Sequence, residues 1–301
     1  MILLQWLATL RNTVLDAVFL TLSEFASETL AILVICVIFW CIQKKAGLTV
    51  AFGWFISAIL VQGMKIVFRI DRPWILDPNF LPVEDAVAGA GGYSFPSGHT
   101  QSAFAIYGSL ALMIKNKGWR AALFLLPVLI GFSRMYLGVH TLLDVGVSMV
   151  LTLAVVVCIK VIWADPPFSA KRLNRLSLAV LVLCFILMVL ALGLYAAQVI
   201  TVKYMSDACQ VVGSGFGFAL GILLGEGKHA EESVKPRSIL GGILRIVLGL
   251  AGVIAIQTVT RLPAIKSIAA TLIGYTLLTF WVVLLYPMIV RKVTPANKNA
   301  A

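Results

Sequence analysis

The chain contains few charged residues for its length. Of its 301 residues only 12% are charged and 60% are hydrophobic, whereas a typical soluble domain has about 25% charged residues. So little polar surface argues against a water-soluble globule, even though soluble proteins expose much apolar area. Apolar runs of roughly 20 residues, the length of a membrane-crossing helix, recur along the chain. Alternating strands of a transmembrane barrel are missing. The composition therefore predicts an all-α, polytopic transmembrane helix bundle.

Several motifs that would indicate other chemistries are also missing. The sequence has no His-Glu-x-x-His, no carboxylate cluster and no Gly-x-x-x-x-Gly-Lys-Ser/Thr loop, so we expect no metal, no cofactor and no ATP-driven pump of that type. Its five cysteines lack the spacing of a metal site or a disulfide framework. The net charge of +11 comes mostly from short loops between apolar runs, so membrane topology explains it and no nucleic-acid partner is expected.

The apolar runs predict about nine membrane spans. Arg11 and Asp16 interrupt the preceding segment Met1–Leu20, which also lacks a small-residue cleavage site. We therefore expect an amphipathic helix at the membrane interface there, not a signal peptide. The expected spans cover residues 29–43, 48–70, 97–114, 120–138, 141–163, 176–200, 208–225, 239–260 and 267–290.

The distribution of Lys and Arg predicts the orientation. Loops after odd-numbered spans, together with the C-terminal tail, hold 15 of the 24 Lys and Arg residues, and the opposite side holds eight. Because cytoplasmic loops carry the cation excess, we expect a cytoplasmic C-terminus. The loop from Arg72 to Pro96 then faces outward, and the expected location is the plasma (inner) membrane.

Two cations lie near the outer end of the second expected span. Lys65 and Arg72 are seven residues apart, close to two helical turns, so we expect them on one helix face. Pro73 is expected to end that helix. The pair can hold an anion, although Lys and Arg at span ends also snorkel to the interface.

A short motif, Pro96-Ser97-Gly98-His99, immediately precedes the third expected span. Ser97 is a candidate helix cap, and Gly98 permits close approach of a phosphate to the backbone. Free N–H groups at a helix start bind anions, and His99 can exchange a proton near neutral pH. An ordinary capped turn is the alternative.

A third cluster runs from Ser133 and Arg134 to His140 and Asp144. His140 and Asp144 are four residues apart, which on a helix places them on one face. A carboxylate on one ring nitrogen leaves the other nitrogen free as a nucleophile or base. Since a lone carboxylate is costly before an apolar run, we expect His140 as the partner of Asp144. A purely structural pair is the alternative.

Together the three clusters resemble the signature of the type 2 phosphatidic acid phosphatase (lipid phosphate phosphatase) superfamily. That signature is Lys-x6-Arg-Pro, then Pro-Ser-Gly-His, then Ser-Arg-x5-His-x3-Asp, and every position is matched in order within residues 1–165. The resemblance implies that His140 is the nucleophile, that Asp144 orients it and that His99 is the general acid and base. It implies that the phosphoryl oxygens are held by Lys65, Arg72, Ser97, Gly98 and Arg134.

The function implied by the resemblance is a metal-independent membrane lipid phosphatase with a phospho-histidine intermediate. Implied substrates are undecaprenyl diphosphate, phosphatidic acid, phosphatidylglycerol phosphate and sphingoid phosphates. The spans disfavour the soluble acid phosphatases and vanadate-binding haloperoxidases of the same superfamily. Two alternatives stay open, namely a lipid phosphotransferase and a lipid transporter or scaffold that retains the phosphate site.

The C-terminal helices are not explained by the three motifs. The phosphatase core is expected within residues 1–165, or to about residue 200 with a sixth core span, and residues 176–301 are additional helices of unknown role. Glycines at every fourth position permit close helix packing. We expect this face to pack against the eighth span, with a homodimer as the alternative. The glycines are Gly213, Gly217, Gly221 and Gly225.

Overall fold

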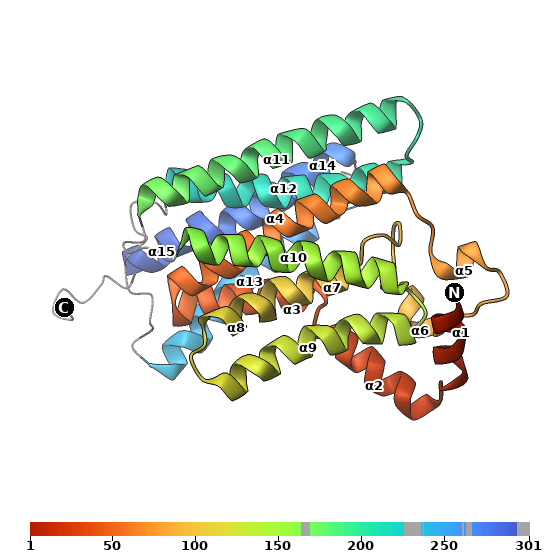
Figure 1. The fold of residues 1–301 in the computed structure, drawn as a ribbon. Coiled ribbons are helices and arrows are strands. Elements are labelled where there is room, and N and C mark those ends of the chain that lie inside the picture. Colours follow the sequence, from red (N-terminus) through yellow and green to blue (C-terminus); the bar gives the residue numbers. More distant parts are fainter. Residues whose placement is uncertain (164–168, 226–235, 237, 261, 263–266, 294–301) are drawn as a thin grey trace. The chain divides into compact units, whose positions relative to one another are not determined.

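The computed structural model describes residues 1–163, 169–225, 236, 238–260, 262 and 267–293 (Figure 1). Every regular element in these ranges is a helix, and the expected all-α transmembrane bundle is confirmed. The last residues of the C-terminal tail, 294–301, for which a cytoplasmic location is expected, lie outside the described residues.

The chain forms two compact units. The N-terminal unit comprises Met1–Leu33 and Ile56–Val161, and the C-terminal unit comprises Val34–Phe55 and Ile162–Ala301. Residues 34–55, which the sequence analysis includes in the phosphatase core, therefore group with the C-terminal helices. All three sequence motifs lie in the N-terminal unit.

Seven helical segments are long and apolar enough to cross a membrane, or up to eight if the bent pair α2 (Thr13–Glu24) and α3–η1 (Glu28–Ile42) is one span. The expected number of nine is not confirmed for the described residues. The third expected span corresponds to α7 (Gly98–Ala103), the π-helical turn η2 (Phe104–Gly108) and α8 (Ser109–Met113), which follow one another without a break and are not among the seven segments. The other segments are α4 (Lys44–Phe68) with α5 (Pro73–Leu76), α9 (Lys117–Tyr136), α10 (Leu142–Ile162), α11 (Ala170–Ala196), α12 (Val202–Leu224), α13 (Ile239–Thr260), and α14 (Ile268–Phe280) with η5 (Trp281–Leu285) and α15 (Tyr286–Val293).

The N-terminal segment forms two helices where the sequence analysis expected one. α1 (Ile2–Thr9) ends before Asn12, whose side chain accepts a hydrogen bond from Leu15 N at 3.0 Å and so caps α2. Both helices pack against α9, as Figure 1 shows for α2. The buried Leu4 and Leu7 contact a cluster around Phe80. The segment is therefore part of the packed N-terminal unit, and its interfacial location stays a prediction.

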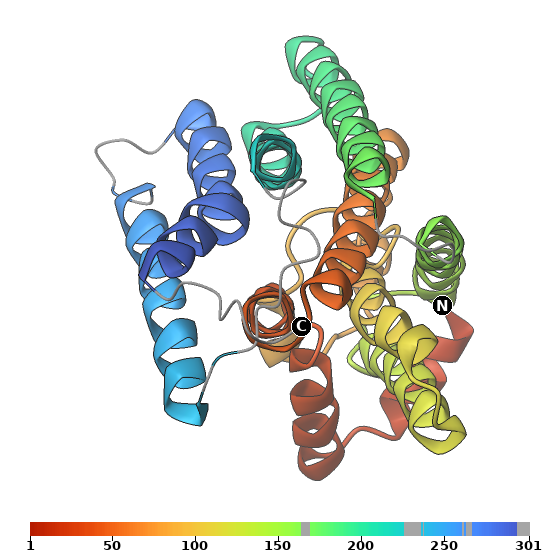
Figure 2. The same ribbon diagram turned by 90° about the vertical axis from the view of Figure 1, so that its left-hand side faces the viewer.

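The glycine face of α12 packs inside the C-terminal unit. A Cβ added at Gly213 would lie 2.5 Å from Leu272 O, and one at Gly217 would collide with Thr276 O, so these glycines permit close contact with α14. The prediction that this face packs against the eighth expected span, α13, was wrong. α13 packs against α14 and η5 instead (Figure 2), and Trp281 Nε1 of η5 donates to Gly249 O at 3.0 Å. Dimerisation through the glycine face stays a prediction.

Candidate active site

Only one of the two cations of the first motif lies within a helix. Lys65 lies in the last turn of α4, which ends at Phe68, whereas Arg72 has an extended backbone (φ −70°, ψ 153°) and caps α5. The expectation that both share one helix face was therefore wrong. Pro73 is the first residue of α5, a position that suits its fixed φ, and it forces the residue before it out of the helical region.

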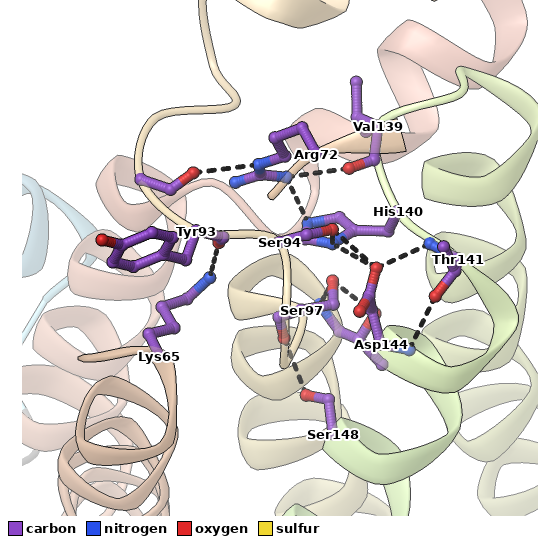
Figure 3. A network of polar contacts seen from close by, with 12 residues as sticks. Lys65, Arg72, Tyr93, Ser94, Ser97, Val139, His140, Thr141, Asp144 and Ser148 are labelled. Atoms are coloured by element: carbon purple, nitrogen blue, oxygen red, sulfur yellow. Dashed lines mark hydrogen bonds and ion pairs between the residues drawn. The ribbon is translucent and has the colours of Figure 1, made fainter. Parts of the chain in front are cut away.

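Arg72 joins a loop to the nucleophile candidate. Its side chain is 4% exposed, and it donates to Gly92 O from Nε at 3.1 Å and to Gly91 O from Nη2 at 2.8 Å. Nη1 donates to Val139 O and lies 2.9 Å from His140 Nε2. Lys65 Nζ donates to the next carbonyl of the same loop, Tyr93 O, at 2.6 Å (Figure 3). Both cations are therefore fixed around residues 91–93.

The second motif forms the expected helix start. Ser97 Oγ accepts from Thr100 N at 3.4 Å and from Thr100 Oγ1 at 2.9 Å, so it caps α7. The backbone of Ser97 is held on both sides, because its N–H donates to Asp144 O and its carbonyl accepts from Ser148 Oγ at 2.7 Å. A Cβ added at Gly98 would meet nothing within 4 Å. The backbone is thus fixed, with open space beside Gly98.

His99 follows Gly98 in the first turn of α7. Its side chain is partly exposed, and with the described part of the chain it makes no hydrogen bond. Loss of hydration, followed by the positive charges of Arg134, Arg72 and Lys65, lowers the pKa of His99 to about 3 in the ligand-free protein. His99 therefore belongs to the same charged cluster and keeps both ring nitrogens available.

Arg134 lies in the last turn of α9 and is 3% exposed. Nη1 donates to Ser23 Oγ of α2 at 2.5 Å. Nε and Nη2 are buried and have no hydrogen-bond partner among the described residues. A buried charged group with unused donors is costly, and an anion with several acceptor oxygens would satisfy them.

His140 does not lie on a helix. α10 begins at Leu142, and His140 lies in the preceding link after Gly138, whose φ is 78°. The pair arises from a reciprocal cap, in which Thr141 N donates to Asp144 Oδ2 at 2.7 Å and Asp144 N donates to Thr141 Oγ1 at 3.3 Å. This cap places Asp144 Oδ2 3.5 Å from His140 Nδ1. The two residues are together as expected, but the helix-face reasoning was wrong.

The hydrogen bonds define the protonation state of His140. A guanidinium can only donate, so Nε2 accepts from Arg72 and the ring proton resides on Nδ1. Burial lowers the pKa of His140 well below its ordinary value of 6.5, and the positive charges of Arg72 and Arg134 lower it further. The imidazole is therefore neutral near pH 7, with its lone pair on Nε2.

Two serines of the site were not singled out by the sequence analysis. Ser94 Oγ donates to Asp144 Oδ2 at 2.6 Å and lies 3.5 Å from His140 Nδ1, and Ser23 holds Arg134. Neither has a spacing that points to the site. The Thr141–Asp144 cap does have a readable pattern, since Thr-x-x-Asp before an apolar run resembles a capping box.

The site is rich in donors and cations and poor in metal ligands. No group of three His, Cys, Asp or Glu that could hold a metal occurs in the described ranges. A neutral imidazole, three cations and a helix N-terminus suit a tetrahedral oxyanion, and phosphoryl transfer depends chiefly on such positioning and charge stabilisation.

Comparison with known proteins identifies a phosphatase family. Residues 46–167 match the PAP2 superfamily, and residues 209–298 match the PAP2 superfamily phosphatase, transmembrane extension. Undecaprenyl-diphosphatase BcrC of Bacillus subtilis is 30% identical over 152 residues, which cover 48% of this chain and 72% of that protein. The undecaprenyl-diphosphatase of Sulfolobus acidocaldarius is 31% identical over 104 residues, 34% of this chain and 48% of that protein.

Two solved structures resemble about half of the chain. A transmembrane PAP2 type phosphatidylglycerolphosphate phosphatase from Bacillus subtilis has 23% identity and a TM-score of 0.45, covering 52% of this chain and 81% of that one. Aquifex aeolicus LpxE has 27% identity and a TM-score of 0.44, with 52% and 92% covered. The sequence matches carry the assignment: the chain belongs to the PAP2 superfamily and is an integral membrane phosphatase with a PAP2 transmembrane extension.

Proposed function

We propose that this phosphatase hydrolyses a lipid diphosphate, with undecaprenyl diphosphate as the first candidate, through a phospho-histidine on His140 and without a metal. The observation that carries the mechanism is the 2.9 Å approach of Arg72 Nη1 to His140 Nε2. In the ligand-free protein the Nε2 lone pair accepts the Arg72 N–H, so substrate binding has to turn that N–H to a phosphoryl oxygen, which brings the phosphorus next to the freed lone pair. The substrate is supported by the names of the two curated relatives, both undecaprenyl-diphosphatases.

In the first step, the His140 Nε2 lone pair attacks the terminal phosphorus. An N–P bond forms, and the bond from phosphorus to the bridging oxygen breaks. The negative charge of the bound diphosphate raises the pKa of His99, and the protonated ring then gives its proton to that oxygen, so undecaprenyl phosphate leaves as the product. The imidazole of the intermediate carries positive charge, which the nearby Asp144 carboxylate stabilises.

In the second step, water attacks the phosphorus of the phospho-histidine. His99, now neutral, takes a proton from the water, the N–P bond breaks, and the electron pair returns to Nε2. Inorganic phosphate leaves, and both histidines are restored. The same group acts as acid and then as base, which is why the unpaired ring of His99 suits the role.

In the transition state, the three equatorial oxygens of the transferred phosphoryl group need hydrogen-bond donors that are already in position. Arg134 offers two buried nitrogens without a partner among the described residues, and the α7 N-terminus offers backbone N–H groups beside the open space at Gly98. Lys65 and Arg72 add positive charge near His140. Stabilisation of this kind is usually the largest catalytic contribution.

The proposal extends to the location of the reaction. The cation excess of the alternate loops supports an active site on the extracytoplasmic side of the plasma membrane and a cytoplasmic C-terminus. A site at that interface receives a substrate whose polyprenyl tail remains in the bilayer.

The test is phosphate release by the purified protein in detergent with a chelator present. The panel contains undecaprenyl diphosphate, phosphatidic acid, phosphatidylglycerol phosphate and a sphingoid phosphate, with His140→Ala as the comparison. We expect release from undecaprenyl diphosphate that the variant lacks, and an acid-labile phosphoryl group on the wild-type protein after rapid quenching in base.

The other outcomes distinguish the alternatives. Phosphate release only when a lipid acceptor is absent, with transfer when it is present, would indicate a phosphotransferase. Faster turnover of another lipid would change the assigned substrate but leave the proposed mechanism in place. Full activity of His140→Ala would refute the nucleophile, and substrate binding without turnover by the wild type would favour a transporter or scaffold.

A further inference from the structure

Ser94 is a buried side chain outside the three motifs. It has no exposed surface, and its N–H donates to Ile70 O at 2.8 Å, which ties the loop before the second motif to the link after α4. Its hydroxyl is directed to the pair formed by His140 and Asp144 (Figure 3). The loop is thus anchored so that one hydroxyl reaches the centre of the site.

The hydrogen bonds of Asp144 are unequal in length. Oδ2 accepts from Ser94 Oγ at 2.6 Å and from Thr141 N at 2.7 Å, whereas His140 Nδ1 lies 3.5 Å away. Bonds to a carboxylate strengthen as they shorten, and 3.5 Å is at the limit of a useful contact. Ser94 and Thr141 therefore fix the position of the carboxylate, and His140 contacts a carboxylate that is already in place.

The proton on His140 Nδ1 faces two oxygens. Nδ1 is 3.5 Å from Ser94 Oγ and also 3.5 Å from Asp144 Oδ2, so both oxygens lie within reach of its N–H. The Ser94 proton is used in the bond to Asp144, which leaves the lone pairs of Oγ toward Nδ1–H. The three groups form a closed triangle behind the nucleophile.

We infer that Ser94 is a positioning residue for His140, which holds the Asp144 carboxylate and shares the Nδ1 proton with it. The role rests on the proposed phospho-histidine function. When Nε2 is phosphorylated, the ring keeps its Nδ1 proton and becomes positive. Ser94 keeps the carboxylate oriented toward that charge and keeps Nε2 directed to the phosphorus.

The experiment compares Ser94→Ala, Ser94→Thr and Asp144→Asn with the wild type in the phosphate-release assay. For Ser94→Ala we expect kcat to fall roughly tenfold to a hundredfold, the effect of losing one hydrogen bond to a charged group. KM and inhibition by inorganic phosphate should stay within about threefold, since the phosphate-holding cations are untouched. Ser94→Thr keeps the hydroxyl and should recover most of kcat.

The double variant tests whether Ser94 acts through Asp144. If it does, Ser94→Ala in the Asp144→Asn background should lower kcat by less than about threefold, because the carboxylate to be held is already lost. Effects that multiply would overturn the inference. The matched control is Ser109→Ala, a buried hydroxyl of the same unit without a partner among the described residues, and it should leave kcat unchanged.

The outcomes for the function and for Ser94 are separable. A wild type that releases no phosphate from any lipid refutes the proposed function, whereas an active wild type with an equally active Ser94→Ala refutes only the role of Ser94. If Ser94→Ala does not fold, Ser94→Cys and Ser94→Thr replace it, because a thiol is a weak donor of similar size. Equal kcat in Cys and Thr variants would then refute the role.

Discussion

Arg134 provides the sharpest test of the phosphate site. We predict that Arg134→Met makes the ligand-free protein more stable and nearly abolishes turnover. The side chain is 3% exposed, with Nε and Nη2 lacking partners in the described ranges. A residue that costs stability in the resting protein and is satisfied only by the substrate is typical of a functional site.

The magnitudes follow from the two unused nitrogens. Each buried, unsatisfied donor costs about 1–3 kcal/mol, and the lost bond to Ser23 offsets about 1 kcal/mol, which leaves a net gain of about 1–5 kcal/mol in the variant. Two charge-assisted bonds to phosphoryl oxygens contribute about 3–6 kcal/mol to the transition state. Their loss lowers kcat/KM roughly 10²–10⁴-fold.

Two measurements on the same preparations test this reasoning. Thermal unfolding in detergent is followed with and without inorganic phosphate, and kcat/KM is measured by phosphate release. Phosphate at 100 times its Kd should stabilise the folded wild type by about 2.7 kcal/mol and so raise its Tm. Arg134→Met should begin at a higher Tm and gain little.

The control is Arg120→Met in the first turn of the same helix. Arg120 is exposed and donates only to Ile114 O among the described residues, so its loss should change neither the response to phosphate nor kcat/KM beyond about twofold. The reasoning fails if Arg134→Met keeps kcat/KM within tenfold of the wild type, or if phosphate raises its Tm as much as it raises that of the wild type.

Three further predictions concern other parts of the chain. Because burial and nearby cations hold the pKa of His140 well below 6.5, the neutral nucleophile persists as the pH falls, so the acidic limb of kcat/KM should lie below pH 6.5; a limb centred above 6.5 would contradict this. His99→Ala should lower kcat with the lipid substrate on the order of 10²–10⁴-fold but much less with a p-nitrophenyl phosphate, whose leaving group needs no proton; equal losses would argue against the acid role. Gly217→Ala should lower Tm because its Cβ collides with Thr276 O, whereas Gly193→Ala, which meets nothing within 4 Å, should not; equal Tm values would mean that α12 and α14 separate easily.

The motif residues were predictable because their chemistry is local in the sequence. Lys65, Arg72, His99, Arg134 and His140 are ionisable groups beside apolar runs, and such groups are costly unless they are used. The sequence therefore indicates which side chains gather. It does not indicate the helix boundaries that bring them together, since a single proline or capping residue changes a boundary by a full turn.

The missed features all depend on contacts between distant segments. Ser94 reaches Asp144 across 50 residues, and Ser23 reaches Arg134 across 111, so neither has a periodicity that reveals it. The α12 glycines pack against α14, where the backbone carbonyls of Leu272 and Thr276 occupy the space that a Cβ at Gly213 or Gly217 would need. A small-residue stripe predicts close packing but cannot specify the helix that fills it.

The loop at residues 91–93 has a consequence for the turnover cycle. Its three successive carbonyls accept hydrogen bonds from Arg72 and Lys65, so an arriving phosphate exchanges one set of acceptors for another. Only the difference between the two sets appears in the affinity. When inorganic phosphate leaves, Arg72 and Lys65 return to the same carbonyls. The loop therefore competes with the product for the two cations, and this competition favours product release.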